Sequence, residues 1–137
     1  MLLKFVLSLC ASFPIYAWQC DCVDIAAAQA KQGAQIVFQG VVTAFRDSPT
    51  GHRVAVFRVS RVWKGHVAAT FEMPAVQGDC IGFYPGLLKI GNELLVFADR
   101  LGSDVPVLHA YYPQKCGTKL IKDAKDIKDL GPGQKPK

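Results

Sequence analysis

The sequence predicts a single, mainly β domain: a small, strongly curled sheet of five strands, with a short helix before it and another helix after it. Three observations support this fold class. Apolar and polar residues alternate with a period of two through the middle of the chain. Clusters of Gly, Pro, Asp and Ser separate the alternating segments, as turns do. An apolar stripe at helical spacing appears near the C-terminus.

The chain begins with an apolar leader, residues 1–17, which reads MLLKFVLSLCASFPIYA. One cation, Lys4, precedes an apolar run from Phe5 to Phe13, and Ala17 offers a small residue for cleavage. The run is shorter than the roughly 20 apolar residues that span a bilayer. It predicts a cleaved signal peptide rather than a buried N-terminal element. We therefore expect a protein that is secreted or that stays in a periplasm or cell envelope, with no membrane span.

A short helix and a long strand follow the leader. Asp24 is placed to cap an Ala-rich helix over 25–32, and Gly33 is placed to end it. The segment 36–45, IVFQGVVTAF, predicts a strand in which Gly40 indicates a bulge or a bend.

The clearest strand is 53–65, RVAVFRVSRVWKG, which follows a turn at 46–53. Strict alternation places Trp63 on the same face as Phe57 and places Val62 on the opposite face. Because both faces are apolar, the strand is predicted to lie in the centre of the sheet and to be covered on both sides. The residues expected to be mostly buried are Val56, Phe57, Val59 and Trp63.

Shorter segments complete the predicted sheet. Strands are expected over 69–75, 92–98 and 107–112, which brings the total to five. Five strands with bends and two flanking helices suit a small curled barrel of the OB type over residues 18–130.

A helix is predicted over 118–131, TKLIKDAKDIKDLG, with Thr118 as its cap and Gly131 and Pro132 as its stop. Its apolar stripe consists of Leu120, Ile121, Ala124, Ile127 and Leu130. Beyond it, residues 131–137 are predicted to be a disordered basic tail.

Cysteine spacing adds a constraint. Cys10 leaves with the leader, and an even set remains: Cys20, Cys22, Cys80 and Cys116. In an exported chain this set favours two disulfides, for which three pairings are possible. A redox pair within Cys20-Asp21-Cys22 would close a strained ring, and a zinc site usually shows two CxxC-like hooks. We therefore expect one bond from this pair to each of the two distant cysteines, and no metal site.

No catalytic constellation is evident. His52, His66 and His109 have no partners at ligand or catalytic spacing. The chain shows no nucleophile elbow, no glycine-rich phosphate loop and no marked pair of carboxylates. The sequence therefore predicts a protein that is not an enzyme and that needs no cofactor.

The charge balance is basic: 16 Lys and Arg face 11 Asp and Glu, for a net charge of +5. Much of the excess lies after Cys116, which suits a solvated tail with a weak attraction to acidic surfaces. No basic patch alternates with aromatic residues, so a nucleic-acid partner is not predicted. We expect a monomer with a protein partner.

These features together resemble a known family. The motifs are CxC near the mature start, IVFQGVV, RVAVFRVSRVWKG, a cysteine-containing loop, NELLVFA and KCGTKLIKDA. From Cys20 to about Leu130 the chain resembles the netrin-like fold, and in particular the N-terminal domain of tissue inhibitors of metalloproteinases and its bacterial-type relatives. The resemblance implies a five-stranded OB barrel. It also implies the disulfides Cys20–Cys80 and Cys22–Cys116.

In the inhibitors of that family, the first cysteine is the mature N-terminus. Its α-amino group and carbonyl oxygen bind the zinc of the target protease, and the next residue enters the substrate pocket. The resemblance assigns these roles to Cys20 and Asp21. Cleavage after Ala17 would leave Trp18 and Gln19 in front of Cys20, so that the nitrogen of Cys20 is an amide and a poor zinc ligand. The family's additional disulfide is also missing.

Three functions remain open at this point. The first is an exported, disulfide-stabilised, non-catalytic protein-binding module of the netrin-like type. The second is an active inhibitor of a zinc metalloprotease that acts through the Cys20 end. The third is a structural protein of the cell envelope that its Lys-rich tail holds to acidic polymers.

Overall fold

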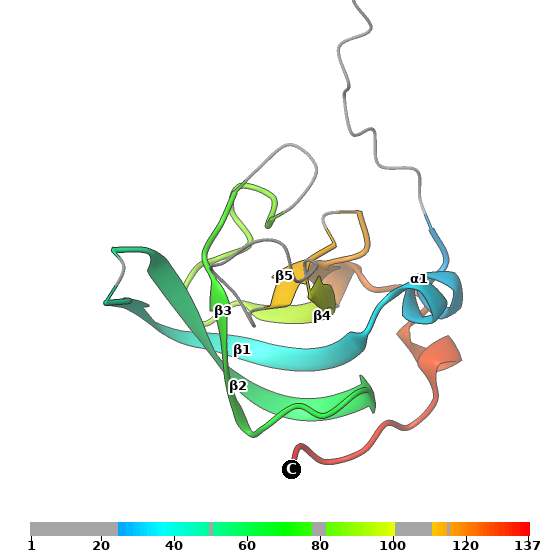
Figure 1. Cartoon of the computed structure of the whole chain (residues 1–137). Coiled ribbons are helices and arrows are strands. Elements are labelled where there is room, and N and C mark those ends of the chain that lie inside the picture. The colour runs from blue at the N-terminus through cyan, green and yellow to red at the C-terminus, as the bar shows by residue number, and fades with distance from the viewer. Residues whose placement is uncertain (1–24, 50, 78–81, 101–110, 115) are drawn as a thin grey trace, which may run out of the picture.

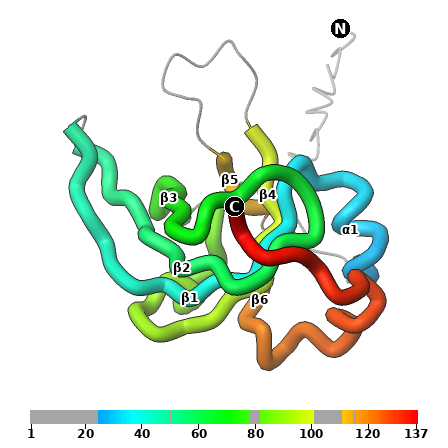
Figure 2. Tube along the Cα trace, turned by 90° about the horizontal axis from the view of Figure 1, so that it is seen from below, coloured from blue at the N-terminus to red at the C-terminus, as the bar shows by residue number. Residues whose placement is uncertain are grey.

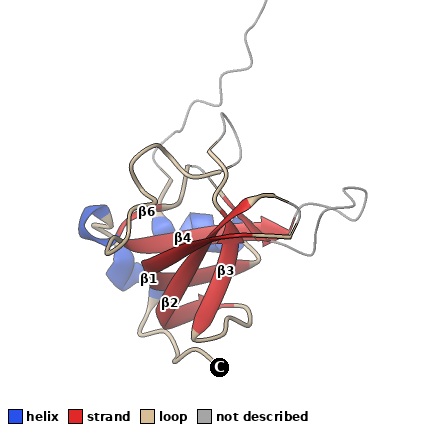
Figure 3. Cartoon of the chain, turned by 90° about the vertical axis from the view of Figure 1, so that its left-hand side faces the viewer, coloured by secondary structure: helices blue, strands red, loops and turns tan. Residues whose placement is uncertain are grey.

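The computed structural model describes residues 25–49, 51–77, 82–100, 111–114 and 116–137. Its elements are α1 (Ala27–Gly33), β1 (Ile36–Asp47), β2 (Arg53–Lys64), β3 (Thr70–Pro74), β4 (Glu93–Arg100), β5 (Tyr111–Pro113) and β6 (Lys119–Leu120), with two short 3-10 helices, η1 (Ile121–Asp123) and η2 (Ile127–Leu130). This part of the chain is mainly β with little helix, as predicted (Figure 3).

The strands form one curled antiparallel sheet (Figure 1). Its order is β3-β2-β1-β4-β5, and β6 also pairs with β4. Strand β1 therefore lies between β2 and β4 and pairs with both of them. In β3-β2-β1-β4, a meander of three strands is followed by a fourth that returns beside the first, which is a Greek key.

Irregular pairing bends the long β1–β2 ladder. The register shifts between Gln39 and Gly40, so that Gln39 pairs with Arg61 and Gly40 with Val59, and Ser60 has no Cα partner. A Cβ at Gly40 would lie 3.2 Å from the carbonyl oxygen of Arg58, so the two backbones approach closely here. The bulge predicted at Gly40 is confirmed. Bulges increase local twist and so help the sheet to curl.

The bulge also changes which residues share a face. Beyond Ser60 the alternation is out of phase, so Val62 joins Phe57 in one hydrophobic core while Trp63 packs against the other. The expectation that Trp63 shares a face with Phe57 is therefore wrong. An extra residue in a strand reverses the side-chain alternation beyond it.

The two edge strands of the sheet approach one another through their side chains. The ring of Phe71 on β3 lies 5.9 Å from that of Tyr111 on β5, centroid to centroid. The ring of Phe38 on β1 lies 5.4 Å from that of Phe71, beneath this contact. The sheet therefore curls into a half-barrel around an aromatic interior.

Both faces of the sheet are covered. The inner core holds Ile36, Phe38, Val42, Ala55, Phe57, Val59, Val62, Val67, Met73, Phe83, Leu94, Val96 and Ala98. The outer core holds Ala27, Ala30, Ala34, Val37, Leu95, Phe97, Ala124 and Leu130 beneath α1 and η2. On β2, Phe57 and Val59 are buried, whereas Val56 and Trp63 are half-buried. This strand lies inside the sheet, between β3 and β1, as predicted, but its second face is only partly covered, since Val56 is half-buried and Arg58 is exposed.

The N-terminal helix forms, but without the predicted cap. Helix α1 starts after Ala26, whose side chain makes no capping hydrogen bond. Asp24, the predicted cap, lies outside the described residues. A different carboxylate serves the helix end, because the backbone N–H of Ala27 donates to Oδ2 of Asp126, at 2.7 Å. An orphan donor of the first turn is thus satisfied by a residue distant in sequence.

The predicted helix over 118–131 is wrong. Lys119 and Leu120 pair with β4 as β6, and the rest forms the short helices η1 and η2 with a break at Ala124. Of the apolar stripe, Ala124 and Leu130 are buried in the outer core and Ile121 and Ile127 pack against it, whereas Leu120 packs against the inner core. A helix of this length is marginal alone. The open edge of β4 provides backbone partners for Lys119 and Leu120. This pairing replaces the first turn of the predicted helix.

The C-terminal residues also differ from expectation. Residues 131–137, predicted to be disordered, lie along the end of β2 (Figure 2). Gln134 and Val62 exchange two backbone hydrogen bonds, of 2.8 and 2.7 Å, and the N–H of Lys137 donates to the carbonyl of Val67 at 3.1 Å. Nε1 of Trp63 donates to the carbonyl of Gly131 at 2.8 Å. Backbone pairing orders this segment although its composition is polar.

We predict that Phe57→Ala costs about 3–5 kcal/mol of unfolding free energy, because it removes a fully buried ring and leaves a cavity. That ring contacts Phe38 and Phe83, with centroids 5.7 and 6.1 Å away. Arg58→Ala, at the exposed neighbouring position, is the control and should change little. Urea denaturation of the three proteins measures the difference. Equal midpoints for the wild type and Phe57→Ala would contradict the placement of this ring.

Candidate functional site

Most of the residues that the sequence marked for function lie outside the described residues: Cys20, Asp21, Cys22 and Cys80. Cys116 is described. It lies in the turn that follows β5, it is half-buried, and it is disulfide-bonded. It is the only cysteine among the described residues. The pairing therefore stays a prediction.

The turn that carries Cys116 is fixed firmly to β4. The hydroxyl of the buried Thr118 accepts a hydrogen bond from the N–H of Phe97 at 3.1 Å and lies 3.2 Å from its carbonyl oxygen. A Cβ at Gly117 would lie 3.1 Å from the Phe97 ring, so this position lies against the ring. The Cys-Gly-Thr motif thus serves tertiary packing, and Thr118 is not the helix cap that the sequence suggested.

A polar network ties the end of α1 to the same region. The N–H of Gln35 donates to Oδ1 of Asp99 at 2.8 Å. The amide of Gln114 donates to Oδ2 of Asp99 at 2.6 Å and to the carbonyl of Gly33 at 3.2 Å. The N–H of Arg100 donates to Oε1 of Gln35 at 2.7 Å. This network has no signal in the sequence, because its members are far apart along the chain.

The first described residues line a cavity of about 350 Å³ at the start of α1. The lining residues are Ile25, Ala26, Lys119, Asp123, Lys125 and Asp126. Ile25 and Ala26 therefore lie beside residues of the C-terminal turns. The Cys116 turn, this cavity and the Asp99 network form the candidate site, which we call the N-terminal anchor.

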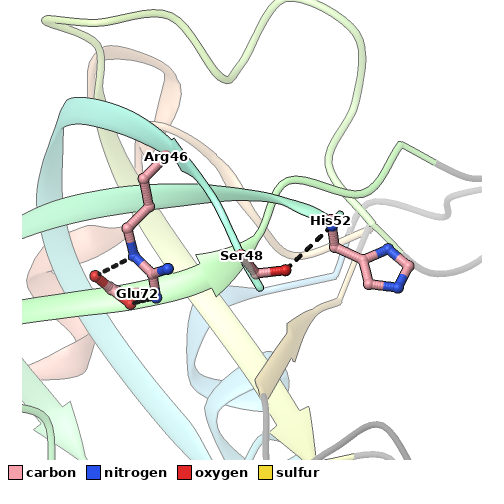
Figure 4. Close-up of polar contacts among 4 residues, drawn as sticks. All are labelled: Arg46, Ser48, His52 and Glu72. Carbon is pink, nitrogen blue, oxygen red and sulfur yellow. Dashed lines mark hydrogen bonds and ion pairs between the residues drawn. The ribbon is translucent and has the colours of Figure 1, made fainter. Parts of the chain in front are cut away.

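At the other end of the sheet, an ion pair joins Arg46 on β1 to Glu72 on β3 (Figure 4). Nε of Arg46 donates to Oε1 of Glu72 at 2.7 Å, and Nη2 pairs with the second carboxylate oxygen. The hydrogen bond from Arg46 lowers the pKa of Glu72, and the same bond raises the pKa of Arg46. Both side chains are exposed, so solvent screens the pair and its contribution to stability is small.

A contact between Ser48 and His52 on the β1–β2 hairpin does not have the geometry of a nucleophile and its base. The hydroxyl of Ser48 accepts from the backbone N–H of His52 at 3.1 Å. The imidazole points away from the hydroxyl (Figure 4). The contact is a turn-stabilising bond.

Two other kinds of site are absent from the described residues. No group of three or more His, Cys, Asp or Glu among them is placed to hold a metal ion. No helix in the same part of the chain is long and apolar enough to cross a membrane. Comparison with models of known protein families and with curated proteins finds no match.

We predict that Thr118→Val destabilises the protein by about 1–3 kcal/mol, because it leaves the buried N–H of Phe97 without its acceptor. Valine has the shape of threonine, so packing is preserved and the loss reports on the hydroxyl. Thr118→Ser keeps the hydroxyl and is the matched control, which should be destabilised less. Thermal unfolding of both variants makes the comparison. A serine variant that melts below the valine variant would show that packing alone matters here.

Proposed function

We propose that the mature chain is an exported, disulfide-stabilised, non-catalytic protein-binding module on an OB-type barrel of the netrin-like kind. The observation that carries the proposal is the strand arrangement. The order β3-β2-β1-β4-β5 contains a Greek key, and its edge strands meet through the rings of Phe71 and Tyr111. An OB fold is a five-stranded, partly open Greek-key barrel, so closure between β3 and β5 would complete one.

The placement of Cys116 supports the pairing Cys22–Cys116. Ile25 and Lys119 line the same cavity. Cys22 and Cys116 each precede one of these two residues by three positions. Three residues of extended chain span roughly 10 Å, which lets both thiols reach the neighbourhood of that cavity. The pairing Cys20–Cys80 then follows as the remaining one.

The N-terminal anchor suits a module that presents its N-terminal segment to a protein partner. The root of this segment is held by Asp126, and the other end of α1 is held by the Asp99 network. A segment fixed at its root loses less conformational freedom on binding. We propose that the partner contacts Cys20 and Asp21, and that a zinc metalloprotease is the partner class to test first.

The disulfides give the first test. We predict that peptide mapping of unreduced mature protein finds Cys20–Cys80 and Cys22–Cys116. In the chain-entropy model, a cross-link that closes a loop of about 60 residues contributes roughly 4 kcal/mol, so reduction should lower the melting temperature strongly. A bond between Cys20 and Cys22, or stoichiometric zinc on four thiols, would contradict the pairing.

Protease inhibition gives the second test. We predict that protein processed after Ala17 inhibits zinc metalloproteases weakly or not at all, because the amide nitrogen of Cys20 has little lone-pair density to give zinc. A variant that begins at Cys20 and carries Asp21→Thr should inhibit more strongly. The same trimmed chain with Asp21 retained separates the effect of the free amine from that of the side chain. Titration against a panel of zinc proteases measures all three.

Strong inhibition by the untrimmed chain would make the inhibitor the primary function. Failure of both trimmed forms, with the disulfides intact, would remove the zinc proteases as partners.

A further inference from the structure

An open groove runs between the end of β2 and the C-terminal segment. Its larger part, of about 400 Å³, is lined by Lys31, Val62, Trp63, Lys64, Gly65, Leu130, Pro132, Gly133 and Gln134. Its smaller part, of about 60 Å³, is lined by Val62, Gly65, His66, Val67, Gln134, Lys135 and Lys137. The two parts share Val62, Gly65 and Gln134, so they adjoin one another. We call this surface the C-terminal groove; the segment that forms one wall is red in Figure 2.

The charge of the groove has one sign. Lys31 and Lys64 line the larger part, and Lys135 and Lys137 line the smaller part. None of the residues that line either part is Asp or Glu. Like charges gathered in a groove raise the local concentration of ions of the opposite sign. The ligand that complements this surface is therefore anionic.

The walls of the groove are held in place by hydrogen bonds within the fold. Nζ of Lys64 donates to the carbonyl of Lys31 at 2.8 Å and to that of Gln32 at 3.3 Å, at the C-terminal end of α1. An ammonium group here is favoured by the helix dipole. The opposite wall is fixed by the paired backbones of Gln134 and Val62. The cations therefore sit on a formed surface and not on a free tail.

We propose that the C-terminal groove binds an acidic polysaccharide through its carboxylate or sulfate groups. The two parts of the groove adjoin and lysines line both of them, which suits an extended polyanion. Its lining is mostly polar. Protein partners bind chiefly through aromatic and apolar anchors in desolvated pockets, so this lining favours a hydrophilic polymer over an acidic protein. The proposal does not depend on the protein-binding role of the N-terminal anchor.

The test uses the full mature chain with intact disulfides and measures binding to polygalacturonate and dextran sulfate by titration calorimetry at low and moderate salt. Lys135→Gln with Lys137→Gln should weaken binding about fivefold for each lysine, as expected for a lysine near an anionic surface. The slope of log affinity against log salt should fall by about one per lysine. Lys89→Gln with Lys122→Gln, which removes the same charge outside the groove, should leave the affinity nearly unchanged.

Gln134 offers a sharper variant. Its bonds to Val62 are made by the backbone, so Gln134→Glu keeps the bridge and places a carboxylate between the two parts of the groove. We expect about fivefold weaker binding, by the same electrostatic argument with the opposite sign. Gln134→Ala is the matched control and should bind like the wild type. Thermal unfolding of each variant checks that the fold is retained.

Several results would overturn the proposal. One is an equal loss of affinity when the two groove lysines and when the two control lysines are replaced. That result would indicate attraction to the net charge alone. Another is equal loss in Gln134→Ala and Gln134→Glu. Tighter binding of polyglutamate than of either polysaccharide would identify an acidic protein as the ligand instead. Absence of binding to both polysaccharides at low salt would reject the groove as an anion site.

Discussion

The fold depends on a central pair of strands that is buried on both faces. On β1 and β4, Val37, Phe38, Leu94 and Leu95 are almost completely excluded from solvent, although neighbouring residues of a strand point in opposite directions. Apolar surface on both sides must be covered from both sides. The inner face is covered by the curl of the sheet itself. The outer face needs a second layer, which α1 and the C-terminal turns supply.

This requirement explains where the sequence predicted the structure well. The long apolar strands and the bulge at Gly40 are encoded locally, by alternation and by a residue without a side chain. The short helix is also local, because its alanines favour helix and pack closely on the sheet. For the candidate site, the sequence predicts four paired cysteines. Of these, only Cys116 lies among the described residues.

The failures have a common physical origin in contacts between distant segments. A helix was predicted after Thr118, but the free edge of β4 pairs with Lys119 and Leu120 as β6. The polar composition of 131–137 predicted disorder, but the unpaired end of β2 ordered it. The reversal of phase at Ser60 and the network around Asp99 depend on which strands become neighbours. Periodicity in one segment carries no information about that choice.

The C-terminal segment has a consequence for how this protein behaves at high concentration. Strand β3 pairs with β2 as far as Arg58, and the N–H of Val59 donates to the carbonyl of Ala69, so only the last part of β2 would present unpaired backbone groups. Gln134 occupies part of this stretch through its bonds to Val62. An open strand edge is a template on which a second chain can add by the same backbone bonds. Residues near Gln134 therefore cover a strand edge that could otherwise pair with a second chain. A fusion or truncation that displaced them would expose unpaired backbone groups and favour self-association.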